Sequence, residues 1–155
     1  DLTKLIHDCH QAGVPHPCEV FAYGHLPLAW SSRCFTARRH QTPKDRCKFV
    51  CQKYPEGLVL RSQESRDVFT LNGIQTLSSA CQDQRHELTV MADMGVSVAR
   101  LSPRAEGMAE VVKAFDQSRH GRLATPDPLT LVDAEICDGY WYGRPGMDNT
   151  RTMTG

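Results

Sequence analysis

Apolar residues near the start of the chain recur at helical spacing. The i, i+3, i+4, i+7 pattern of one helix face is made by Leu2, Leu5, Ile6 and Cys9. With Gly13 as a stop signal, this pattern predicts a helix over residues 2–12. After a break containing two prolines, the β-branched and aromatic residues of 19–23 predict a short buried strand.

The rest of the chain continues this alternation. A helix is expected from Leu26 to Arg38, with Pro27 in its first turn, and a polar loop over residues 39–46. Another helix is expected from Leu77 to near Gly95, on the stripe Leu77, Cys81, Leu88 and Met91. Short strands are expected at 58–60, 68–71 and 96–101, with a turn at Asn72-Gly73 that permits a hairpin, and a last helix is expected to open at Ser102-Pro103.

Alternating helices and strands with short connections predict an α/β fold with parallel strand pairing. About four credible strands are too few to close a (β/α)₈ barrel, which typically needs ≈ 250 residues. The sheet is therefore either open or part of a barrel. Residues 1–155 are expected to form a single domain, with a loosely ordered tail over 142–155.

Charge and cysteine content narrow the class of protein. Eighteen basic residues balance eighteen acidic ones, which disfavours nucleic acid as a partner. No apolar run reaches the roughly 20 residues of a membrane helix, so membrane insertion is not expected. Seven cysteines cannot all pair, which points to a reducing compartment and a cytoplasmic protein.

Three of these cysteines have a spacing suited to a shared metal. Cys34, Cys47 and Cys51 form C-x(12)-C-x(3)-C, and the last two would share a face if they lay on one helical turn. Basic neighbours would offset the thiolate charge: Arg33, Arg38, Lys44, Arg46 and Lys48. Spacing alone leaves an iron–sulfur cluster and a zinc site with His40 as fourth ligand nearly level, and ordinary core packing is the third reading.

The remaining chemically active residues carry weaker signals. Glu19, in the first predicted strand, is a weak candidate for a catalytic acid or base, and pairing with an arginine such as Arg33 is favoured over that role. Cys81 and Cys137 are expected to pack in the core rather than bind metal. The seven histidines show no arrangement typical of hydrolytic catalysis.

Several longer segments are more specific than any spacing. They are Glu19–Gly24, Ser32–Arg38, Pro43–Asp45, Lys53–Pro55, Leu71–Thr76, Arg100–Pro103 and Cys137–Trp141. Together with the three cysteines, these segments resemble the UbiU/UbiV branch of the collagenase-like peptidase family, over about residues 18–141.

The resemblance implies a TIM-barrel-like fold, of which this chain would be the C-terminal half, and one 4Fe-4S cluster. Cys34, Cys47 and Cys51 would be three of its ligands, with the fourth in an N-terminal half. It also implies a heterodimer with a UbiU-like protein, association with ubiquinone-pathway proteins, and dioxygen-independent ring hydroxylation of a ubiquinone precursor. The alternatives are a collagenase-like peptidase or an RNA-modifying enzyme of the same family, and a zinc-stabilised binding module.

Overall fold

The computed structural model describes residues 2–14, 16–122 and 135–152. Its helices are α1 (Leu2–Gln11), α2 (Phe35–Arg39), α3 (Leu88–Asp93) and α4 (Met108–Arg119), with 3₁₀ turns η1 (Lys44–Arg46), η2 (Val50–Lys53), η3 (Arg85–Glu87) and η5 (Gly139–Tyr142). Its strands are β1 (Cys18–Trp30), β2 (Leu58–Arg61), β3 (Asp67–Asn72), β4 (Gln75–Asp83), β5 (Val96–Leu101) and β6 (Ile136–Cys137).

The strands form one mixed sheet in the order β2-β3-β4-β1-β5, with β6 on β4. Pairing is antiparallel for β2–β3, β3–β4 and β4–β1, and parallel for β1–β5 and β4–β6. The α/β class is thus confirmed, whereas the expected parallel pairing holds only for β1–β5 and β4–β6 and is wrong for the other three pairs. Within the described residues the six-stranded sheet is open rather than closed into a barrel, so a TIM-barrel-like fold stays a prediction.

The first strand is longer than its sequence indicated. β1 runs on to Trp30, so the helix predicted from Leu26 to Arg38 is wrong over its first part, and only α2 is helical there. Its partner strand holds β1 extended, with His25 opposite Cys81 and the Leu26 N–H donating to Ser78 Oγ at 2.8 Å. Register shifts on either side of Pro27 accommodate the missing N–H.

The helix predicted from Leu77 to Gly95 is also wrong over its first half. β4 occupies Gln75–Asp83, and helical structure begins only at η3 and α3. Leu77 and Cys81 are four residues apart, a spacing that puts side chains on one face of a helix but also on one face of a strand. Ladders to β1 and β3 on both sides decide in favour of the strand.

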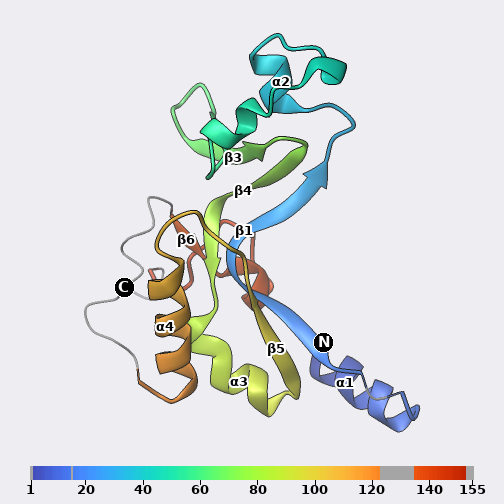
Figure 1. Cartoon of the computed structure of the whole chain (residues 1–155). Coiled ribbons are helices and arrows are strands. Elements are labelled where there is room, and N and C mark those ends of the chain that lie inside the picture. Colours follow the sequence, from blue (N-terminus) through green and yellow to red (C-terminus); the bar gives the residue numbers. More distant parts are fainter. Residues whose placement is uncertain (1, 15, 123–134, 153–155) are drawn as a thin grey trace.

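The core lies where α4 packs against the paired strands β1 and β4 (Figure 1). It is formed by Ala22, Tyr23, Cys81, Val111 and Phe115. The rings of Tyr23 and Phe115 meet edge to face, with centroids 5.8 Å apart. Cys81 and Cys137 are both fully buried, which confirms the packing role expected for them.

The segment before α4 is not helical as predicted. Ser102 continues the sheet, because its N–H donates to the Tyr23 carbonyl at 2.8 Å. The Ala105 N–H then donates to Glu56 Oε1 at 3.0 Å, and the helix begins at Met108 after Gly107 in the left-handed conformation. Tertiary contacts at Ser102 and Ala105 therefore keep this segment irregular instead of helical.

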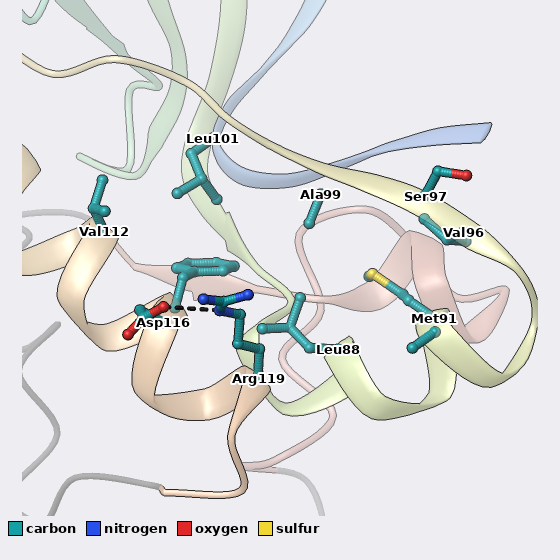
Figure 2. A pocket seen from close by; sticks show the side chains of 11 residues that line it. Leu88, Met91, Val96, Ser97, Ala99, Leu101, Val112, Asp116 and Arg119 are labelled. Atoms are coloured by element: carbon teal, nitrogen blue, oxygen red, sulfur yellow. Dashed lines mark hydrogen bonds and ion pairs between the residues drawn. The ribbon is translucent and has the colours of Figure 1, made fainter. Parts of the chain in front are cut away.

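A hollow of about 380 Å³ lies between α3, β5 and α4 (Figure 2). Its walls are mostly apolar, and at its edge Arg119 Nε donates to Asp116 Oδ1 at 2.8 Å. None of the helices that the structure describes has the length and apolar content that crossing a membrane requires.

The described part of the C-terminal segment returns to β6. The Asp138 carboxylate accepts hydrogen bonds from the Thr150 N–H at 2.7 Å and the Thr150 hydroxyl at 2.8 Å. Arg151 reaches the carboxylates of Asp83 and Asp138 at 3.6 and 3.7 Å. The loose order expected for residues 142–155 stays a prediction.

Candidate metal centre

The three predicted ligands lie in one small unit, residues 31–57, which joins β1 to β2 and which we call the cysteine unit. Figure 1 shows it beyond the β3–β4 hairpin, at the opposite end of the long β1–β4 ribbon from α3 and α4. Two hydrogen bonds tie it to the hairpin turn: Ser31 N–H to the Ile74 carbonyl and Phe35 N–H to the Gly73 carbonyl, both at 2.8 Å. Within the unit, α2 packs against η2.

Cys34 is fixed at the start of α2. It is the N-cap residue, in an extended conformation, and its Sγ accepts a hydrogen bond from the Ala37 N–H at 3.4 Å. A sulfur in this position receives a backbone N–H donor, and hydrogen bonds of this kind to the sulfurs of an iron–sulfur centre help to set its potential.

Cys47 and Cys51 do not share a helical turn, contrary to the expectation from their spacing. Cys47 is extended at the end of η1, whereas Cys51 lies in η2. Between them Phe49 adopts φ 50°, a left-handed conformation that costs a non-glycine residue roughly 1–2 kcal/mol. This bend directs the Phe49 N–H to Cys47 Sγ at 3.4 Å. Backbone strain placed between two candidate ligands is typical of functional segments.

The cysteine unit offers the ligand type of the predicted cluster, but not a complete set of ligands. Three free thiols on one exposed unit, two of them accepting N–H bonds, are the ligand type that an iron–sulfur centre takes. The arrangement is incomplete, because within residues 2–14, 16–122 and 135–152 no three His, Cys, Asp or Glu side chains converge on one metal position. The residues thus fit the centre in kind but not in number or position.

His40, the fourth ligand of the zinc alternative, lies in the same unit. Its Nε2 is 3.2 Å from the Tyr54 hydroxyl, and the two rings have centroids 5.8 Å apart. This contact joins the end of α2 to the end of η2. In this arrangement Nε2 already has a hydrogen-bond partner, so a zinc ion would bind His40 through Nδ1 unless Tyr54 were displaced.

Glu19 is paired with an arginine, but the partner is Arg100 on the neighbouring strand β5 rather than Arg33. Arg100 Nε donates to Glu19 Oε1 at 2.8 Å, and its guanidinium lies 4.9 Å from the centroid of the Phe21 ring. Both side chains of the pair are about half exposed. A catalytic role for Glu19 stays a prediction.

Sequence reasoning gave no role to His25 and Arg104, which line a cavity beyond the end of the parallel pairing of β1 with β5. His25 fell between the first predicted strand and the helix predicted from Leu26, and Arg104 fell inside the last predicted helix. A signal was present in the run Arg100-Leu-Ser-Pro-Arg104, where two cationic residues bracket the end of a predicted strand.

Comparison with known proteins shows distant similarity to a curated protein. The chain is 24% identical to a protein named collagenase from Porphyromonas gingivalis, and the similarity covers 93% of this chain and 40% of that protein. This similarity supports the collagenase-like family. No family model and no solved structure matches the chain. The chain spans well under half the length of its relative, so the activity of the whole relative is not transferred to it.

Proposed function

We propose that this chain carries part of an iron–sulfur centre in a UbiV-like subunit, which acts with a UbiU-like partner in dioxygen-independent ring hydroxylation of a ubiquinone precursor. A 4Fe-4S cluster supplies one-electron transfer at a potential that its surroundings set. The proposal rests on the sequence segments that resemble this branch and on the distant similarity to a collagenase-like protein.

The observation that carries the proposal is the pair of N–H bonds to cysteine sulfur. The backbone N–H groups of Ala37 and Phe49 donate to the sulfurs of Cys34 and Cys47, although neither cysteine is buried in the core. Cys51 lies on η2, which packs against the helix that Cys34 caps. The chain's own contribution is to present these sulfurs on an exposed unit, where a ligand from elsewhere in the assembly has access.

Complementation tests the functional part. Bacteria that lack their own UbiV-like protein but keep the UbiU-like one are grown without dioxygen, and ubiquinone is quantified after the full-length protein is supplied. We expect ubiquinone to form with the wild-type protein, to fall at least tenfold with Cys34→Ser, and to be unchanged with Cys18→Ser. Absence of ubiquinone with stably expressed wild-type protein would contradict the proposal.

A peptidase is the second candidate, because the relative is named collagenase. It predicts release of peptides from gelatin by the purified protein. Hydrolysis that survives Cys34→Ser and Cys51→Ser would favour this candidate over the iron–sulfur subunit.

A further inference from the structure

A cavity of about 400 Å³ opens where the parallel pairing of β1 with β5 ends, between the cysteine unit and the core. Ligand sites in α/β proteins gather at the carboxyl ends of parallel strands, where loops leave room and backbone groups are free. Gly24 makes the close approach there: it has φ 121°, and a β-carbon on it would collide with the Ser102 side chain. The strands therefore converge at the cavity wall.

Among the arginines that line this cavity, Arg104 has the longer ion pair. Its side chain is only 19% exposed, and its ion pair with Glu56 is long, with Nη2 and Oε2 3.9 Å apart. That separation exceeds a hydrogen bond. A guanidinium carries five N–H donors, and shielding them from water without acceptors is unfavourable. Arg104 is thus placed to accept an anion.

A second donor without a partner lies behind it. The Tyr23 side chain is fully buried, and within the described residues its hydroxyl makes no hydrogen bond. Burial raises the pKa of Tyr23 to about 12, although the nearby Arg104 acts in the opposite direction. The hydroxyl therefore stays protonated at neutral pH, and it lies behind Arg104 in the core rather than among the residues that line the cavity.

The other basic groups of the cavity, Arg100 and His25, are already engaged. Arg100 is held by Glu19 at 2.8 Å. His25 Nδ1 lies 2.8 Å from the Ser78 carbonyl, and burial lowers the pKa of its ring, so His25 remains neutral. Arg104 is consequently the charge available to a ligand, and one guanidinium beside one carboxylate suits a small monoanion better than a polyanion.

The remaining wall is apolar. Trp30, at the end of β1, lines the cavity with a side chain that is 67% exposed, and Pro27, Leu77 and Pro103 extend the same surface. A large exposed indole beside a shielded cation offers a flat ligand both a stacking surface and a charge partner. We propose that this cavity binds a small organic carboxylate, with its carboxylate on Arg104 and its apolar ring against Trp30.

The test uses benzoate as the probe and benzamide as the uncharged analogue of the same shape. Binding to the purified protein is measured by calorimetry at fixed ionic strength, and by Trp30 fluorescence in a Trp141→Phe background. We expect benzoate to bind at least tenfold more tightly than benzamide, because only benzoate forms charge-assisted hydrogen bonds with Arg104. Equal binding of the two probes, or no benzoate binding, would overturn the proposal.

Three variants assign the effect to the cavity. Arg104→Gln should weaken benzoate binding roughly tenfold or more, whereas Arg61→Gln, which removes an exposed arginine paired with Asp67 on the β2–β3 hairpin, should change nothing. Glu56→Gln keeps an oxygen for the Ala105 N–H but removes the competing charge, so it should tighten binding several-fold.

If a thermal melt shows that the Arg104→Gln variant does not fold, benzoate binding to the Glu56→Gln variant tests the proposal instead. Tighter binding supports the site, and unchanged or weaker binding refutes it. A competition arm with inorganic phosphate separates the anion classes. Phosphate that displaces benzoate with higher affinity would replace the organic carboxylate by a phosphate ligand and overturn the proposal.

Discussion

The two ends of the long β1–β4 ribbon are built on different principles. At one end, Phe115 of α4 packs against Tyr23 and Cys81, and stability comes from apolar burial. At the other, the cysteine unit has only one buried residue among those described, Thr36, and consists of one short helix and two 3₁₀ turns. Such a unit cannot be held by burial alone, whereas a bound metal would supply that stability.

Five of the seven cysteines divide in the same way. Cys81 and Cys137 are sealed in the core end, whereas Cys47 is exposed and Cys34 and Cys51 are half-buried. A thiol in the core packs as a small hydrophobe, while an accessible thiol with a backbone donor is suited to metal binding. The location of each cysteine is therefore more informative than the number of cysteines.

Phe115→Ala should produce the largest change, at the core end. The ring is nearly buried against Tyr23, and its removal should lower the free energy of unfolding by about 4 kcal/mol through lost burial and the cavity left behind. Denaturant unfolding measures this loss. A loss of less than about 1 kcal/mol would mean that the core does not lie here.

Asp83→Asn should come next. Its carboxylate is buried and receives Arg85 Nη2 at 2.7 Å and Nε at 3.0 and 3.1 Å. The substitution removes the negative charge that faces the buried Arg85 guanidinium, and we expect a loss of about 3 kcal/mol in urea unfolding. Asp67→Asn, which breaks the exposed pair with Arg61, is the control and should cost less than about 1 kcal/mol.

At alkaline pH, the free energy of unfolding should depend on the two core thiols, Cys81 and Cys137. Burial raises the pKa of Cys81 to about 11 and the pKa of Cys137 to about 12. The folded protein therefore holds protons that the unfolded chain releases, so stability is intact below about pH 9 and falls as pH rises toward 11–12. The expected slope is about 1.4 kcal/mol per pH unit for each thiol, read from urea unfolding at each pH. Cys47→Ser should leave the slope unchanged, and a flat profile between pH 9 and 11 would contradict this assignment.

The smallest change is expected in the cysteine unit. Phe49→Gly relieves the left-handed backbone, and the ring is 65% exposed, so little packing is lost. We expect the metal-free unit to gain less than about 1 kcal/mol, visible as slower hydrogen exchange over residues 44–53. Lys48→Gly, a neighbour outside the left-handed region, should have the opposite sign, and a loss with Phe49→Gly would show that the bend is not strained.

Local pattern predicted α1, β5 and the β3–β4 hairpin, because each is specified by its own periodicity or turn residues. It failed where distant partners decide. Pro27 and the i, i+4 pair Leu77 and Cys81 favoured helices, but mutual pairing of β1 and β4 makes both segments strands. The three cysteines could be singled out from spacing, whereas their separation by the bend at Phe49 could not. The cavity residue Arg104 was missed because residues 102–107 are held by contacts with Tyr23 and Glu56.

The most direct test of the shared metal centre is analysis of iron, acid-labile sulfide and zinc in the full-length protein prepared without oxygen. We predict iron and sulfide in roughly equal amounts, as in a 4Fe-4S cluster. Cys34→Ser, Cys47→Ser and Cys51→Ser should each lose both, and Cys18→Ser should keep them. Zinc without sulfide, or a loss in Cys18→Ser as large as in the other three variants, would contradict a cluster on these cysteines.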